Sequence, residues 1–99
     1  MSKSDAHESK KAQVLAEGRG YILDAHTHTV RNRLELEASQ TAGCFYCCEV
    51  FSPSEIKEWV DDNECAVCPY CGIDSIIGEA SGFPAADKKF LKEMNEFWF

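Results

Sequence analysis

Apolar side chains recur at helical spacing most clearly near the end of the chain. This stripe predicts a helix over about residues 87–97, with Asp87 at the N-cap position. Its members are Phe90, Leu91, Met94, Phe97 and Trp98. Because they share one broad face, we expect this helix to pack its aromatic side against the rest of the domain.

A second helix is predicted from Ser52 to Asp61. Ser52 and Glu55 form a capping box around Pro53, which suits a first helical position. Ile56, Trp59 and Val60 then follow at helical spacing. The polar run 61–63 is expected to end this helix in a turn.

Weaker patterns cover the remainder. They predict a short helix over 12–17, a helix from a Thr29 cap to about Ala38 with Val30 and Leu34 on its apolar side, and a strand over 73–77. Residues 1–11 are polar and are expected to form a flexible tail, leaving 12–99 as a single domain.

Six cysteines change this picture, since a domain of 99 residues often needs a staple. Cys44 and Cys47 form one C-x-x-C pair, and Cys68 and Cys71 form another after twenty intervening residues. Gly72 and Pro69 suit a tight second turn. Two such pairs predict one tetrahedral zinc site within a core of residues 44–78.

Four thiolate ligands make a closed, structural zinc site that has no open position for water or substrate. The sequence also lacks a phosphate-binding glycine loop and a G-x-S-x-G nucleophile motif. We therefore expect one structural Zn²⁺, no catalytic residues and no enzymatic activity.

Cys48 and Cys65 lie outside this quartet. Cys48 adjoins Cys47, so we expect a small buried side chain there. Cys65 is spaced so that Cys65 with Cys68 could replace Cys68 with Cys71 as the second pair. Either extra thiol could act in redox sensing if it were exposed. A thioredoxin-like site fits poorly, because it would have a single C-x-x-C motif within a βαβ unit.

His26 and His28 are separated by one residue, so an extended segment would project both rings to the same side. They could then reach one ion. The preferred interpretation is two surface or cap-region histidines, because the zinc quartet is already complete.

The net charge of −7 is concentrated in residues 44–83, which contain one lysine and eight acidic residues. Such a segment would repel a phosphate backbone, so nucleic-acid binding is disfavoured and a basic protein partner is favoured. No apolar run approaches the roughly 18 residues of a membrane span, and the N-terminal stretch does not resemble a secretory signal. We therefore expect a cytoplasmic protein without a membrane partner.

Several stretches together resemble a family of small bacterial cytoplasmic proteins of unassigned function. They are Gly43–Cys47, Ser54–Ile56 with Glu58 and Trp59, Cys68–Ser75, Ser81–Pro84, Phe90–Met94 and the final Trp98-Phe99. The resemblance covers roughly residues 40–99. It implies a zinc-ribbon or treble-clef-like core with zinc at Cys44, Cys47, Cys68 and Cys71. It supplies no catalytic residue and includes neither Cys48 nor Cys65.

These observations predict a small α+β domain stapled by zinc, with two zinc knuckles, a short β-hairpin and flanking helices. The favoured function is an immunity- or adaptor-like protein-interaction module with an acidic surface. A nucleic-acid-binding zinc ribbon and a thiol redox sensor are the alternatives. The sequence does not define the partner or the oligomeric state.

Overall fold

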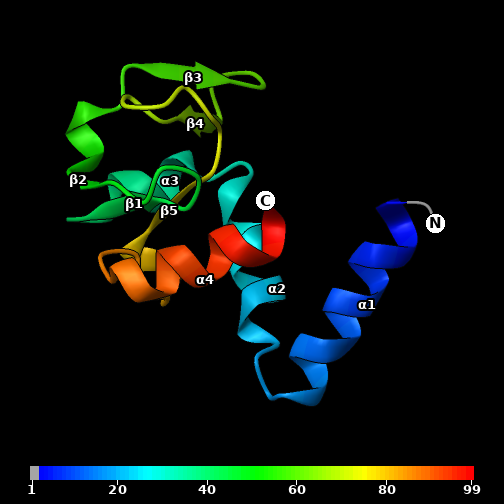
Figure 1. The fold of residues 1–99 in the computed structure, drawn as a ribbon. Coiled ribbons are helices and arrows are strands. Elements are labelled where there is room, and N and C mark those ends of the chain that lie inside the picture. The colour runs from blue at the N-terminus through cyan, green and yellow to red at the C-terminus, as the bar shows by residue number, and fades with distance from the viewer. Residues whose placement is uncertain (1–2) are drawn as a thin grey trace.

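The computed structural model describes residues 3–99 and has the predicted α+β character (Figure 1). Three helices come first, the five strands follow, and a fourth helix ends the described part of the chain. The helices are α1 (Lys3–Ala16), α2 (Tyr21–His26), α3 (Arg33–Glu37) and α4 (Lys88–Trp98), with single 3₁₀ turns η1 (Thr27–Thr29), η2 (Pro53–Glu55) and η3 (Glu79–Ser81). The strands are β1 (Ala42–Cys44), β2 (Val50–Phe51), β3 (Glu58–Val60), β4 (Cys65–Val67) and β5 (Ile76–Gly78).

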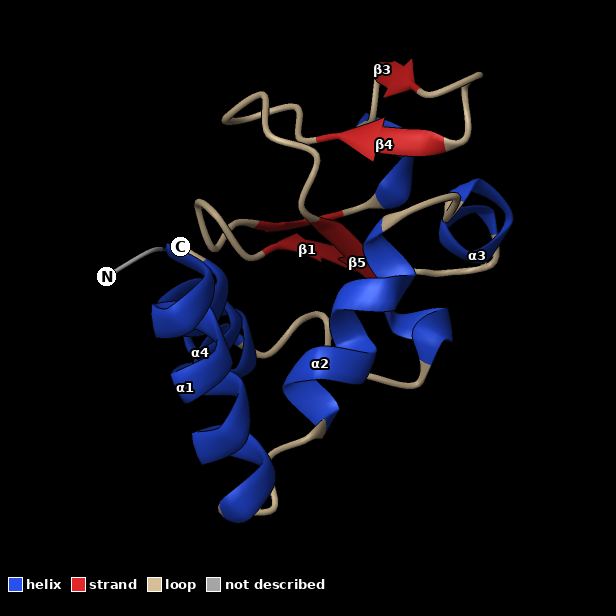
Figure 2. Cartoon of the chain, turned by 90° about the vertical axis from the view of Figure 1, so that its right-hand side faces the viewer, coloured by secondary structure: helices blue, strands red, loops and turns tan. Residues whose placement is uncertain are grey.

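The strands form two small antiparallel sheets. One has the order β2-β1-β5, and the other is the β3–β4 hairpin. Figure 2 shows the hairpin above the three-stranded sheet, with α2 and α4 below that sheet. Cys44 and Cys47 lie at the turn from β1 to β2, and Cys68 and Cys71 lie where the chain passes from the hairpin to β5.

Helix α4 has the predicted cap and the predicted apolar face. Asp87 Oδ1 accepts a hydrogen bond from the backbone N–H of Lys89, which satisfies a free donor of the first turn. Leu91 and Met94 are fully buried. A Cβ built on Gly43 would approach the Ala85 carbonyl oxygen to 2.2 Å, so only glycine lets β1 lie this close to the segment before α4.

The buried side chain of Asn32 joins the two sheets. Its Nδ2 donates to the carbonyls of His28 at 3.1 Å and Ile76 at 2.9 Å, and its Oδ1 accepts from the N–H of Ala66 at 3.4 Å. One amide thus satisfies backbone groups of β5 in one sheet and β4 in the other.

The predicted helix over Ser52–Asp61 is wrong. The capping box at Ser52 and Glu55 is present, but it starts only the single turn η2. The chain is extended again at Ile56, and Trp59 pairs with Ala66 across the hairpin. Asp61, Asp62 and Asn63 have positive φ, which polar residues tolerate better than most, so they reverse the chain.

Thr29 does not start a helix through Ala38. It ends η1, and its Oγ1 donates back to the carbonyl of His26. Helix α3 starts after Asn32, because the positive φ of Arg31 breaks the helical path. Val30 and Leu34 are 57% and 79% exposed, whereas Leu36 is buried.

Helix α1 extends the short helix predicted over 12–17 back to Lys3. Met1 and Ser2 of the predicted tail lie outside the described residues, as do the side chains of residues 3–8. Val14 is buried in a cluster that also contains Phe97 of α4. Strand β5 begins at Ile76, so only the end of the predicted 73–77 strand is a strand.

Candidate metal centre

The fold brings Cys44, Cys47, Cys68 and Cys71 together. All four sulfur atoms lie within 4.8 Å of one another. The Sγ atoms of Cys44 and Cys71 are 3.6 Å apart, and those of Cys47 and Cys68 are 3.7 Å apart. A tetrahedron with Zn–S bonds of about 2.3 Å has edges of about 3.8 Å, so these separations fit four ligands of one ion. They are too long for a disulfide.

The two cysteine turns have the same backbone hydrogen bonds. In the first, the N–H of Cys48 donates to the Cys44 carbonyl at 2.7 Å, and the N–H of Cys44 donates to the Glu49 carbonyl at 3.0 Å. In the second, the N–H of Gly72 donates to the Cys68 carbonyl at 3.0 Å, and the N–H of Cys68 donates to the Ile73 carbonyl at 2.9 Å. We call residues 44–49 the first knuckle and residues 68–73 the second knuckle.

Backbone N–H groups also face the leading sulfur of each knuckle. Tyr46 donates to Cys44 Sγ and Tyr70 donates to Cys68 Sγ, both at 3.4 Å. Such bonds stabilise thiolate charge. Ser75 Oγ lies 3.2 Å from Cys44 Sγ and adds a contact that the first knuckle alone would lack. The matching geometry therefore prepares both turns for anionic sulfur.

Burial and mutual proximity change the pKa values of the clustered thiols. Burial raises the pKa of Cys71 to about 11, with a further rise from the neighbouring Cys44. Burial raises the pKa of Cys47 further still. The pKa of Cys68 is lowered, because hydrogen bonds from the backbone of Tyr70 and Cys71 and from neighbouring thiols outweigh its burial. A divalent cation would favour the thiolate form of all four.

Burial closes this site on most sides. Cys44 and Cys68 are buried, and Cys47 and Cys71 are half-buried. Four sulfur donors match the soft, tetrahedral ligand set that zinc prefers. Among the side chains that the structure describes, residues 9–99, no other group of three or more histidine, cysteine or acidic residues is arranged to hold a metal ion. The centre can therefore take a metal ion, and its donors suit a structural one.

Cys65 lies outside the centre. Its buried Sγ accepts a hydrogen bond from the N–H of Arg31 at 3.1 Å, so it holds the loop before α3 against β4. The alternative pairing of Cys65 with Cys68 is therefore not the one that the fold assembles.

Cys48 occupies the position in the first knuckle that Gly72 occupies in the second. Its φ of 62° matches the left-handed conformation of Gly72 at 80°. The side chain is half-buried against the cluster under α4. Burial raises the pKa of this thiol, which makes it less reactive at neutral pH.

His26 and His28 do not lie in an extended segment. His26 ends α2, and its ring stacks on Trp98 with centroids 3.9 Å apart. His28 lies in η1, and its Nδ1 is 3.0 Å from Glu35 Oε2. Neither belongs to the metal-holding group. Helical rather than extended backbone sends the two rings to different partners.

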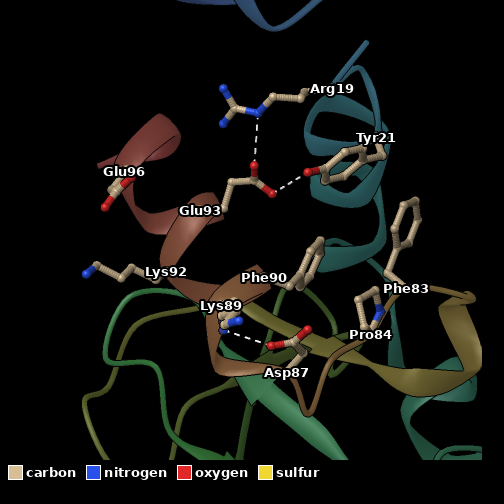
Figure 3. A pocket seen from close by; sticks show the side chains of 10 residues that line it. All are labelled: Arg19, Tyr21, Phe83, Pro84, Asp87, Lys89, Phe90, Lys92, Glu93 and Glu96. Carbon is tan, nitrogen blue, oxygen red and sulfur yellow. Dashed lines mark hydrogen bonds and ion pairs between the residues drawn. The ribbon is translucent and has the colours of Figure 1, made fainter. Parts of the chain in front are cut away.

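A cavity of about 580 Å³ lies away from the cysteines, between α2 and α4 (Figure 3). On its wall Glu93 accepts hydrogen bonds from Arg19 Nε at 2.9 Å and from Tyr21 OH. These bonds tie α4 to the start of α2. Basic and acidic side chains line the cavity in equal number, so its charge selects no particular ligand.

Comparison with known protein families, with curated proteins and with solved structures finds no match for this chain. Among the described residues, no helix combines the length and the apolar character that a membrane crossing requires.

Proposed function

We propose that the chain binds one structural Zn²⁺ through Cys44, Cys47, Cys68 and Cys71, and that it acts as a protein-interaction module rather than an enzyme. The observation that supports the metal most directly is the pair of matching knuckles, whose sulfurs are separated as the corners of a zinc tetrahedron would be. A four-sulfur donor set leaves no open coordination position for substrate.

Native mass spectrometry of the purified protein tests the metal assignment. The expected mass includes one zinc per chain. Cobalt substitution should give the absorption bands of tetrahedral thiolate coordination. Cys71→Ser should abolish stoichiometric zinc, whereas Cys48→Ser, which removes a thiol outside the quartet, should retain it. Equal zinc binding by both variants would contradict the proposed ligand set.

The charge distribution supports the interaction role. All eight acidic residues of segment 44–83 are exposed. None of them belongs to an ion pair among the described residues, where the pairs are formed by Arg19, His28 and Arg33. The single lysine of the segment cannot balance this charge. An acidic surface of this kind favours basic protein partners through steering and complementarity.

Recovery of partners from cytosol tests this role. The wild-type protein should retain a basic protein at low salt and release it as salt rises. The bacterial cytosolic setting, which the motif resemblance implies, belongs to the same proposal. A protein that is fully zinc-loaded but recovers no partner would contradict the interaction role and leave the metal assignment standing.

The two alternatives have less support. Nucleic-acid binding would need basic side chains that face phosphate groups, and Lys57 is the single basic residue of segment 44–83. Redox sensing would need an exposed thiol of low pKa, but Cys65 is buried and the pKa of Cys48 is raised.

A further inference from the structure

Strand β3 leaves one of its edges without a partner strand. In the part of the chain that the structure describes, it pairs only with β4, in a two-stranded sheet. Figures 1 and 2 show β3 at the outer end of the molecule, with β4 between it and the rest of the fold. By contrast, the far side of β4 is covered, because Asn32 accepts from the N–H of Ala66 there. The free edge is therefore the outer edge of β3.

The pairing register shows which backbone groups this edge offers. Ala66 turns its N–H toward Asn32, away from β3, so the facing pair of Trp59 and Ala66 is one that does not bond across the ladder. The N–H and C=O of Trp59 consequently point outward. An extended chain laid along β3 would bond both groups.

Strand β3 also contributes to a groove of about 510 Å³. Trp59, Leu36 and Ile56 line it together with Pro53 and five polar residues. Of the two hairpin strands, β3 contributes Trp59 to this lining and β4 contributes no residue, so the groove reaches the hairpin at Trp59. Side chains alternate along a strand, so a chain paired with β3 could send one apolar side chain toward Trp59 and its neighbours to the opposite face.

The opposite face and the hairpin turn are acidic. Glu58, Asp61, Asp62 and Glu64 are exposed, and no ion pair within the described part of the chain uses them. A second copy of this chain would bring the same charges against them, which disfavours pairing between copies. A strand with lysine or arginine opposite Glu58 and an aliphatic residue opposite Trp59 complements both faces.

We propose that the outer edge of β3 binds a basic, extended segment of another protein by strand addition. Its alternating lysine or arginine side chains meet Glu58 and the hairpin turn, and an aliphatic residue enters the groove beside Trp59. This inference rests on the proposed interaction function and names the surface and the partner chemistry. The paired edge is short, so charge supplies much of the attraction and binding weakens as salt rises.

The probe is a fluorescein-labelled synthetic peptide in which lysine alternates with valine, titrated with the zinc-loaded protein and followed by anisotropy. Binding should slow hydrogen exchange at the Trp59 amide, which points away from β4. The same peptide with its central valine replaced by proline should lose most of its affinity, since proline cannot donate to the edge. Equal affinity of the two peptides would overturn strand addition.

Two matched variants separate local charge from total charge. The hairpin variant combines Glu58→Gln, Asp61→Asn, Asp62→Asn and Glu64→Gln. The control variant combines Asp24→Asn, Glu49→Gln, Asp74→Asn and Glu96→Gln, which are exposed positions elsewhere. We expect the hairpin variant to weaken binding roughly tenfold and the control less than about twofold.

If the two variants weakened peptide binding equally, the assignment to β3 would be wrong. It would also be wrong if the wild-type protein did not bind the peptide at low salt. If sedimentation showed that the hairpin variant forms more dimer than the wild type, the partner at the β3 edge would be a second copy of the chain and not a basic segment. Zinc content is measured on every sample. Loss of zinc marks failure of the metal proposal, whereas zinc-loaded protein that fails to bind peptide marks failure of this inference alone.

Discussion

Cys48 and Gly72 show, at the scale of single residues, how similar backbones tolerate different side chains. Both residues adopt positive φ after the second cysteine of a knuckle. Left-handed backbone costs a residue with a Cβ roughly 1–2 kcal/mol but costs glycine little. Half-burial of the Cys48 side chain against the core under α4 offsets part of that cost.

Gly72→Ala should lower the free energy of unfolding of the zinc-loaded protein by about 1 kcal/mol. A Cβ at Gly72 meets no atom within 4 Å, so the cost is one of backbone conformation and not of collision. Denaturant unfolding measures it. Gly18→Ala is the matched control, since Gly18 also has positive φ in open space but lies outside the metal centre. It should show a similar loss of stability and unchanged zinc affinity, whereas Gly72→Ala should weaken zinc binding as well.

Asn32→Leu should destabilise the protein by about 3 kcal/mol, because it leaves backbone groups of His28, Ile76 and Ala66 buried without a partner. Thermal and denaturant unfolding provide the measurement. Asn95→Leu removes a single bond, to the carbonyl of Tyr46 near the surface, and should cost less than about 1 kcal/mol. Equal effects of the two substitutions would contradict the linking role of Asn32.

Among the elements, α4 depends on its first turn as well as on its apolar face. Asp87→Ala should cost about 1 kcal/mol, because it removes the acceptor for the Lys89 N–H. Asp87→Ser keeps a capping oxygen and should recover most of the loss. Unfolding by denaturant compares the variants, and an alanine variant as stable as the serine variant would show that the cap contributes nothing.

The elements that the sequence predicts well are those with local signals. The α4 stripe, its Asp87 cap and the Ser52 capping box all appear in the structure. The sequence does not predict the β3–β4 hairpin, because the spacing of Ile56, Trp59 and Val60 indicates a helix. Its stability depends on pairing with Cys65–Val67, which is not encoded in the spacing of β3 alone.

In the candidate site, too, features with local sequence signals are predicted and contacts between distant segments are not. Spacing together with Pro69 and Gly72 predicts the four cysteines that the fold assembles, since each pair is a local turn. Spacing alone does not distinguish Cys68 with Cys71 from Cys65 with Cys68. Ser75 and Asn32 gave no signal, because their contacts join segments distant in sequence. A polar residue beside an otherwise apolar run, such as Ser75 before β5, is the only trace of this role.

At the scale of the whole molecule, metal removal should destabilise one of the two buried clusters more than the other. One contains the four cysteines with Leu36, Phe51 and Ile76, and the other lies under α4 and includes Ile22 and Met94. A metal present at about a thousand times its Kd stabilises a fold by about 4 kcal/mol, or on the order of 20 °C in Tm for a chain of this size. Chelation should lower Tm by about that amount.

Hydrogen exchange would show which elements lose stability when the metal is removed. Amides of β1, β3 and β4 should lose protection before those of α4. A chelated protein with unchanged Tm would contradict a structural metal, and uniform loss of protection would contradict the separation of the clusters.

Stability should depend on pH with opposite signs in the two metal states. The raised pKa values of Cys47 and Cys71 favour the metal-free fold while these thiols are protonated. That advantage is present below the ordinary thiol pKa and is lost as pH rises from about 9 toward about 11. Metal binding releases thiol protons, so acid weakens the zinc-loaded protein instead.

Melting curves across pH, with and without chelator, measure both trends. The metal-free Tm should fall at alkaline pH, and the zinc-loaded Tm should fall toward acid. Parallel curves in the two states would contradict thiolate ligation.

The position of the hairpin has a consequence for how the molecule moves in solution. The body measures 39 × 24 × 20 Å, and the acidic β3–β4 turn lies at one extremity (Figure 1). Its charge is therefore off-centre, which gives the protein a permanent dipole moment. In the field of a cationic surface the molecule would rotate during diffusion and arrive hairpin first. The molecule would then be oriented before it touches the partner, and the rest of its surface would seldom contact such a partner.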